Sequence, residues 1–180
     1  MTDKSLNRAL VAFGSNLGDR EVTLSHALVA LENLSEAPLR CSSWWGSTPI
    51  LMAVDAGEFI NGVVEIQTSL SAWQLLIALQ GIEQQAGRPM VHGFNASRVL
   101  DLDIICYGEV VIDSPDLVIP HPRAAQRLFV LMPLAELCPG LVMPGQLDSI
   151  DTLINRVSGE PLTLLRAAPV LPLQRPRPPP

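Results

Sequence analysis

The order of apolar segments along the chain constrains its fold more than any other sequence feature. Short apolar runs predict four strands, over residues 8–14, 39–46, 58–68 and 99–107. Leucines at helical spacing predict two helices between them, over residues 20–34 and 71–86. Strands that follow one another directly lie too close together for the long crossovers that parallel pairing needs. The order therefore predicts an α+β sandwich of the split β-α-β kind with added elements, rather than a doubly wound parallel sheet.

Residues at the ends of the predicted helices support these assignments. Asp19 and Ser71 stand at N-cap positions, where a short side-chain oxygen can accept an unpaired backbone N–H. Gly87 follows the second helix at a position typical of a C-terminal stop. A further helix is predicted over residues 124–137, and Pro133 should end or bend it because proline has no amide hydrogen.

Composition excludes several classes of protein. The chain has 180 residues, 48% of them hydrophobic and 17% charged, which is sufficient for one sizeable core. Its net charge is −6 and only 12 residues are Lys or Arg, so we expect no nucleic-acid partner. No apolar stretch approaches the roughly 18 residues of a membrane span. Three separated cysteines without a CxxC pair indicate a cytoplasmic protein rather than a disulfide framework or a thiolate zinc site.

The C-terminal segment differs in composition from the rest of the chain. Residues 168–180 contain six of the 16 prolines and should form an extended tail. Such a tail can bind a partner, but a solvated tail is the simpler interpretation. We therefore expect one folded domain over residues 1–167, followed by a proline-rich tail.

Asp101 and Asp103 form the sharpest chemical feature of the sequence. They lie in the predicted strand 99–107, where residues two apart project from the same face of a sheet. Neighbouring carboxylates in apolar surroundings repel each other unless a cation lies between them or one stays protonated. Mg²⁺ held by one or two carboxylates and by substrate phosphates satisfies this arrangement. A pair neutralised by arginines at a sheet edge is the equally weighted alternative.

Basic side chains flank the same strand in the sequence and favour phosphoryl chemistry. They are Arg88, Arg98, Arg123, Arg127 and His121. Arginines and a metal ion can together bind a polyphosphate. Each residue is a weak signal alone, because an arginine is more often a solvated surface group and a histidine between two prolines can belong to a rigid turn.

Several segments share one order and spacing with a known enzyme family. They are Gly14-Ser15-Asn16-Leu17-Gly18, Phe59-Ile60-Asn61, Ile82-Glu83-Gln84-Gln85 with Gly87-Arg88, Arg98-Val99-Leu100-Asp101-Leu102-Asp103-Ile104, and Ile119-Pro120-His121-Pro122-Arg123 with Arg127-Leu128-Phe129-Val130-Leu131. Over about residues 9–160 the chain resembles 6-hydroxymethyl-7,8-dihydropterin pyrophosphokinase, which transfers the terminal diphosphate of ATP to a pterin alcohol in folate biosynthesis.

The resemblance implies a ferredoxin-like α+β fold, two Mg²⁺ ions, and ATP as co-substrate with release of AMP. It implies that Asp101 and Asp103 bind both metal ions. The expected catalytic residues are Arg88, Arg98, Asp101 and Asp103. The expected phosphate contacts are Arg88, Arg98, His121 and Arg127, and the expected adenosine contacts are Leu76, Gln80, Glu83 and Ile104. The expected pterin contacts are Ser47, Ile50, Phe59, Asn61 and Phe129, with the two phenylalanines stacking on the ring and the amide reading its edge.

The chain also departs from the family pattern. Residues 89–96 lack the further basic residues that family members carry in this loop, Ser97 stands where many relatives have proline, and Leu51 stands where glycine is common. An active, monomeric enzyme is the leading hypothesis. The alternatives are a divergent paralogue that binds pterin or nucleotide with little turnover or acts on a related pterin, and, ranked last, a scaffolding module that uses its proline tail.

Overall fold

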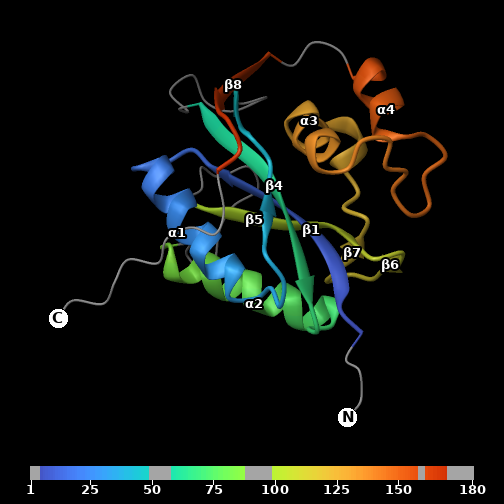
Figure 1. Cartoon of the computed structure of the whole chain (residues 1–180), viewed down its shortest axis with the longest axis horizontal. Coiled ribbons are helices and arrows are strands. Elements are labelled where there is room, and N and C mark those ends of the chain that lie inside the picture. Colours follow the sequence, from blue (N-terminus) through green and yellow to red (C-terminus); the bar gives the residue numbers. More distant parts are fainter. Residues whose placement is uncertain (1–4, 49–57, 88–98, 158–160, 170–180) are drawn as a thin grey trace.

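The computed structural model describes residues 5–48, 58–87, 99–157 and 161–169. The fold is built around a central antiparallel sheet. Its strands are β1 (Asn7–Ser15), β2 (Arg40–Cys41), β3 (Trp44–Ser47), β4 (Phe59–Thr68), β5 (Asp101–Tyr107) and β8 (Leu162–Arg166). They lie in the order β5-β1-β4-β3-β8, and β2 pairs with β4 (Figure 1). A separate two-stranded sheet pairs β6 (Ile112–Asp113) with β7 (Val118–Ile119). The order β5-β1-β4-β3 confirms the predicted ferredoxin-like α+β fold.

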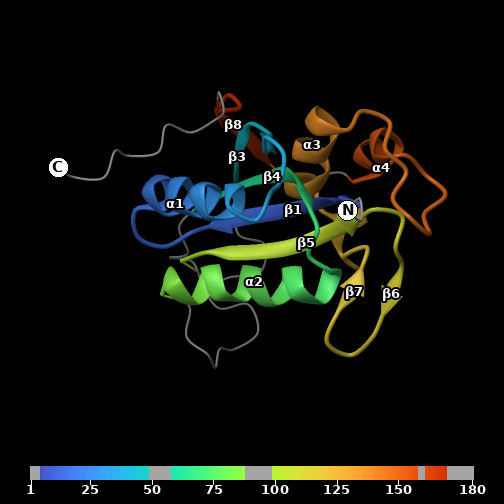
Figure 2. The ribbon, with the colours of Figure 1, turned by 60° about the horizontal axis from the view of Figure 1, so that its bottom comes forward.

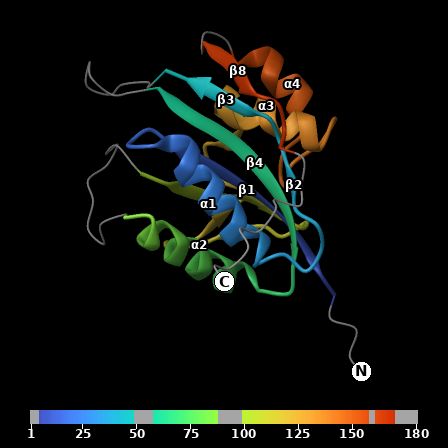
Figure 3. The same cartoon turned by 60° about the vertical axis from the view of Figure 1, so that its left-hand side comes forward.

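Helices cover both faces of the sheet. They are α1 (Arg20–Glu32), α2 (Ala72–Gln85), α3 (Leu128–Leu137) and α4 (Ile150–Arg156), with a short 3₁₀ helix at Ala124–Gln126. Figure 3 shows α1 and α2 on one side of the sheet and α3 and α4 on the other. Within the described residues, no helix combines the length and apolarity needed to cross a membrane.

The predicted caps fix the starts of the first two helices. The Asp19 side chain accepts a hydrogen bond from the Val22 amide at 3.1 Å. Ser71 and Gln74 form a reciprocal capping box, in which each side chain accepts the backbone N–H of the other residue. Gly87 follows α2 with a φ of +100°, which confirms its role at the helix end.

Two hydrophobic cores lie on opposite faces of β1, because successive side chains alternate along a strand. Val11 faces α1 and α2 and is fully buried, whereas Leu10 faces α3 and is 2% exposed. Leu24, Leu28, Leu75 and Leu79 are among the helical residues that complete the first core. Val130, Leu131 and Leu134 of α3 are among those that complete the second.

Two predicted elements are divided in the structure. The predicted strand 39–46 becomes β2 and β3, because the Ser42 hydroxyl, and not a backbone carbonyl, accepts the Val63 amide at 2.9 Å. The predicted helix 124–137 breaks earlier, at Arg127, whose backbone is extended. Pro133 is expected from the sequence to end or bend the helix; it does not end it, because α3 continues through Pro133 to Leu137. Proline removes one backbone hydrogen bond there, and burial of the apolar face of α3 offsets this loss.

Candidate functional site

The two aspartates of β5 project toward the face of the sheet that carries α3. Leu102 and Ile104 are 4% and 5% exposed and belong to the core beneath α1 and α2. Asp101 and Asp103 alternate with them and are half-buried. Ile105 continues the aspartate face and packs in the core of α3. The two carboxylates therefore lie side by side beyond the end of that core.

His121 approaches the aspartates from a loop on the same side. Its backbone N–H donates to the Ile105 carbonyl at 3.0 Å, which fixes the loop against β5. Its Nδ1 accepts from the Arg123 amide at 3.2 Å, and its Nε2 lies 3.7 Å from Asp103 Oδ2. The proton of a neutral imidazole is therefore on Nε2, the atom that faces the carboxylate.

Burial lowers the pKa of His121 below its ordinary value of 6.5. The Asp103 carboxylate opposes this shift, whereas the guanidinium groups of Arg127 and Arg123 reinforce it. A lowered pKa keeps the imidazole neutral at pH 7, so His121 is a hydrogen-bond donor at this site and not a fixed cation.

Asn61 lies in the same row of the sheet as Asp101. In the strand register, Gly14 of β1 stands opposite Asp101 on one side and opposite Asn61 on the other. Two strand spacings place the backbones of Asp101 and Asn61 about 10 Å apart. The Asn61 side chain is buried, and its Nδ2 donates to Ser47 Oγ at 2.9 Å.

Gly14 provides the space that the Asn61 amide occupies. A Cβ atom at position 14 would lie 3.0 Å from Asn61 Oδ1, which is closer than ordinary carbon–oxygen contact. The Ser47 hydroxyl and the open backbone of Gly14 therefore hold the amide in one orientation across the sheet. A fixed amide presents a defined donor and acceptor to a ligand edge.

Two aromatic side chains lie on the same side of the molecule as Asn61. Phe59 precedes Asn61 by two residues on β4, so both side chains leave the same face of the sheet. Phe129 stands in the first turn of α3 and is half-buried. The Arg127 guanidinium carbon lies 5.4 Å from the centre of the Phe129 ring, a cation–π distance.

The predicted adenosine contacts lie on and around α2, at the outer edge of β5 (Figure 2). Gln80 is exposed and Leu76 is half-buried, whereas Ile104 is buried in the core. Glu83 is 2% exposed, and its Oε1 accepts the Leu102 backbone N–H at 2.8 Å. Sequence reasoning missed this backbone contact, because nothing in the sequence of α2 indicates which strand atom Glu83 meets.

Three predicted site residues cannot be placed by this structure. Ile50, Arg88 and Arg98 lie outside the described residues, as do Leu51, Ser97 and the whole segment 89–96. The described part of the site therefore comprises the aspartate pair, His121, Arg127, the residues around Asn61 and the α2 side of β5.

The aspartate pair fits a hard divalent cation. Within the described residues, no group of three or more His, Cys, Asp or Glu side chains is arranged to hold a metal ion. A cage made entirely of protein ligands is therefore not formed by those residues. Two half-exposed carboxylates on one strand face match Mg²⁺, which keeps water and substrate oxygens among its ligands.

The fold and the site together define a ferredoxin-like α+β protein with acidic and aromatic groups gathered at one end of its sheet. The sequence model of 7,8-dihydro-6-hydroxymethylpterin-pyrophosphokinase (HPPK) matches residues 10–139, a range that contains every predicted site residue. The chain belongs to this family. It is therefore an enzyme of the pyrophosphokinase class.

Curated relatives support the family assignment. The 2-amino-4-hydroxy-6-hydroxymethyldihydropteridine pyrophosphokinase of Bacillus subtilis is 40% identical over 133 residues, which cover 73% of this chain and 78% of the relative. The enzyme of the same name from Pseudomonas aeruginosa is 40% identical over 139 residues, covering 77% of this chain and 85% of the relative.

Solved structures support the fold. Wild-type Plasmodium falciparum HPPK-DHPS matches with a TM-score of 0.68 at 14% identity, over 84% of this chain and 44% of that one. The same protein with pterin and p-hydroxybenzoate matches with a TM-score of 0.67 at 15% identity, over 87% of this chain and 44% of that one. This chain thus spans less than half the length of those proteins.

Proposed function

We propose that the chain transfers diphosphate from ATP to the hydroxymethyl group of 6-hydroxymethyl-7,8-dihydropterin, releasing AMP, as a step of folate biosynthesis. Family membership supports the reaction. The observation that carries the proposal is the common row of Asp101, Gly14 and Asn61, in which the Asp101 carboxylate and the Asn61 amide leave one face of the sheet. This supports a metal-binding role for the carboxylate and a pterin-binding role for the amide. The reaction needs the Asp101 carboxylate and the Asn61 amide within reach of the same bound pterin alcohol molecule.

In this proposal the described residues divide the work of binding both substrates. Asp101 and Asp103 hold two Mg²⁺ ions, which when bound neutralise phosphate charge and lower the pKa of the alcohol. Asn61 reads the hydrogen-bonding edge of the pterin, while Phe59 and Phe129 stack on its faces. The Ser47 hydroxyl keeps the Asn61 amide in place.

The phosphate-binding role falls to cationic and neutral donors around the aspartates. Arg127 contributes charge beside the Phe129 ring, and His121 contributes an Nε2–H donor on the side of Asp103. Arg88 and Arg98 complete the set. Their residue type supports this role, because one guanidinium group can donate two hydrogen bonds to the oxygens of a phosphate.

We further propose that α2 receives the nucleotide at the outer edge of β5. Leu76, Gln80 and Ile104 contribute apolar and amide contacts, while Glu83 orders the strand edge beside them. The three cysteines are free and buried, which supports a reducing, cytoplasmic location. The comparisons favour neither the divergent paralogue nor the scaffolding module.

The test is AMP formation from ATP and 6-hydroxymethyl-7,8-dihydropterin with and without Mg²⁺. We expect Mg²⁺-dependent turnover, and a loss of roughly 100-fold or more in Asp103→Asn, because one transition-state contact of this kind supplies that much. Asp113 is an exposed carboxylate on β6, so Asp113→Asn is the matched control and should keep the wild-type rate.

Three results would each contradict one part of this proposal. Wild-type turnover in Asp103→Asn would remove the metal role of the pair. Tight pterin or nucleotide binding without AMP release would favour the divergent paralogue. Loss of all measurable function on removal of residues 168–180 would favour the scaffolding module.

A further inference from the structure

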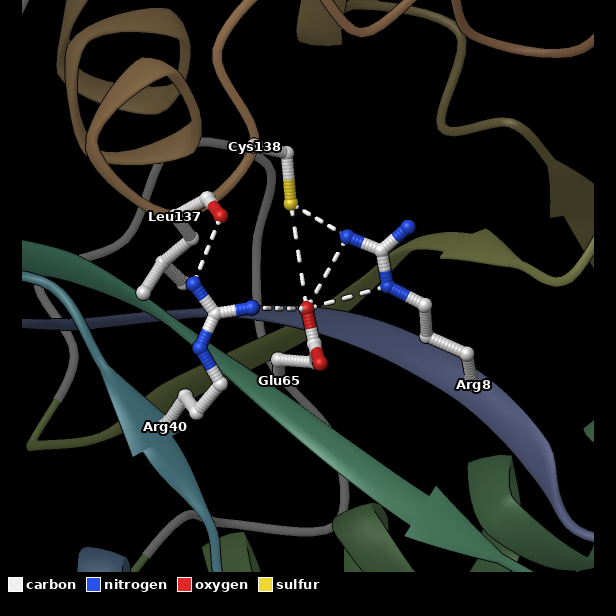
Figure 4. A network of polar contacts seen from close by, with 5 residues as sticks. All are labelled: Arg8, Arg40, Glu65, Leu137 and Cys138. Carbon is white, nitrogen blue, oxygen red and sulfur yellow. Dashed lines mark hydrogen bonds and ion pairs between the residues drawn. The ribbon is translucent and has the colours of Figure 1, made fainter.

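Glu65 of β4 is a carboxylate at the centre of a polar network on the α3 face of the sheet (Figure 4). Its residue is 8% exposed, and one oxygen, Oε2, accepts from Arg8 Nε at 2.9 Å and from an Arg40 guanidinium nitrogen at 3.1 Å. Arg8 lies on β1 and Arg40 on β2. The carboxylate therefore joins three neighbouring strands through charged contacts.

Both arginines continue from Glu65 to the C-terminal end of α3. A second guanidinium nitrogen of Arg40 donates to the Leu137 carbonyl at 2.8 Å, and Arg8 contacts the Cys138 sulfur. The last turn of α3 contains no basic residue of its own. Arg40 thus supplies the cation that the negative end of the helix dipole favours, and it satisfies a terminal carbonyl that has no partner within the helix.

Glu136 forms a second connection in the opposite direction, from α3 to the sheet. Its two oxygens accept from Trp45 Nε1 at 2.7 Å and from the Ser43 backbone N–H at 2.8 Å. Trp45 stands opposite Asn61 in the pairing of β3 with β4. The end of α3 is therefore bound directly to the strand beside the predicted pterin contact.

Directional contacts at the C-terminal end of α3 restrain the position of its N-terminal end, where Phe129 lies. Phe129 lies seven residues before Glu136 in the same helix, about 10 Å along its axis. The apolar face between them, formed by Val130, Leu131 and Leu134, packs on the sheet. Hydrophobic contact is non-directional, whereas charge-assisted hydrogen bonds hold defined atoms together.

We infer that Glu65 is a positioning residue for the pterin site: through Arg40 it holds the C-terminal end of α3, and α3 in turn sets the position of the Phe129 ring relative to Asn61. The inference rests on the proposed function, because it deepens the role given there to Phe129 and Asn61. Glu136 acts in the same way from the helix side. None of these groups touches the reacting atoms.

The test compares binding of the two substrates in network variants of the full chain. In Arg40→Met we expect about tenfold weaker binding of 6-hydroxymethylpterin by titration calorimetry, because loss of a charge-assisted contact lets Phe129 shift. Affinity for MgATP should stay within about twofold. Glu65→Gln should likewise weaken pterin binding and leave MgATP binding nearly unchanged. Arg40→Lys should bind pterin more tightly than Arg40→Met, because an ammonium group can still reach Leu137 O.

Amide hydrogen exchange in α3 provides a readout that is independent of substrate. Amide exchange at residues 130–132 and 134 should accelerate in Arg40→Met. The matched control is Leu28→Ala, which is destabilised in the other core and should not weaken pterin binding more than MgATP binding. Faster exchange with unchanged pterin affinity overturns the positioning role alone, and equal weakening of both substrates overturns it as well. Absence of AMP formation by the wild type contradicts the proposed function instead. Because the Arg40 side chain is 53% exposed, this variant remains a valid test where Glu65→Gln fails to fold.

Discussion

Two glycines determine which side chains can lie across the middle of the sheet. Gly14 leaves room for the Asn61 amide, and Gly62 leaves room for the Phe13 ring on the opposite face. A Cβ at position 62 would lie 2.3 Å from Phe13 Cζ, a separation that non-bonded carbon atoms cannot adopt. Phe13 is buried and packs edge-on against Trp44, so the ring has no free space into which it can move.

We therefore predict that Gly62→Ala lowers the free energy of unfolding by about 1–3 kcal/mol, the usual result of overpacking a core. Gly81→Ala is the matched control, because Gly81 lies inside α2 with no heavy atom near its hypothetical Cβ. That variant should raise the free energy of unfolding by about 0.5–1 kcal/mol. Urea denaturation measures both, and equal effects of the two substitutions would contradict the packing argument.

Local rules predicted some site residues and missed others. That Asp101 and Asp103 lie on the same face follows from the alternation of side chains along a strand, which depends only on neighbours in sequence. The roles of Glu65 could not be predicted, because its partners Arg8 and Arg40 lie 57 and 25 residues away. No sequence periodicity encodes a contact of that range.

At the scale of elements, the contact between α2 and β5 governs the geometry of the aspartates. In the described part of the chain β5 pairs only with β1, so its outer backbone groups need other partners. Glu83 accepts one of them, the N–H of Leu102, which is the residue between the two aspartates. The Glu83 carboxylate thus restrains the strand segment from which both aspartate side chains project toward one face.

We predict that Glu83→Ala lowers the free energy of unfolding by about 1–3 kcal/mol, because it leaves a buried N–H without its acceptor. The same substitution should reduce Mg²⁺-dependent AMP formation. Glu83→Gln retains an acceptor oxygen and should lie closer to the wild type in both measurements. Thermal unfolding and the AMP assay check this order, and identical losses in the two variants would argue against a backbone role.

The accuracy of the predicted elements depended on how their ends are encoded. The predicted starts of α1 and α2 agree with the structure because Asp19 and Ser71 carry capping side chains next to the helices they begin. The strand β8 was not predicted. It is short and mostly exposed, so its sequence shows no sustained alternation of apolar and polar residues. It is placed by its pairing with β3, which is distant in sequence.

At the scale of the whole molecule, two buried thiols link stability to pH. Burial raises the pKa of Cys41 and of Cys106 to about 12, from 9.0 in an exposed cysteine. Above pH 9 the unfolded chain loses these protons while the folded chain retains them, so unfolding is favoured as pH rises through this range.

The free energy of unfolding should therefore fall between pH 9 and pH 12, and the fall should be shallower in the double variant Cys41→Ala/Cys106→Ala. Urea denaturation at a series of pH values gives both slopes. Parallel slopes for the variant and the wild type would show that other groups cause the dependence. The comparison isolates these two thiols from Cys138 and Tyr107, whose pKa values burial also raises.

The place of β1 between β4 and β5 has a consequence for synthesis of the protein in the cell. β1 leaves the ribosome before both of its neighbours, which end only at Thr68 and Tyr107. Both edges of β1 are open to other polypeptides until β4 has been made, and one edge stays open until β5 has been made. Asp101 and Asp103 emerge with β5, so a chain terminated before β5 lacks both carboxylates and leaves one edge of β1 unpaired, which makes it a target for aggregation or for chaperones.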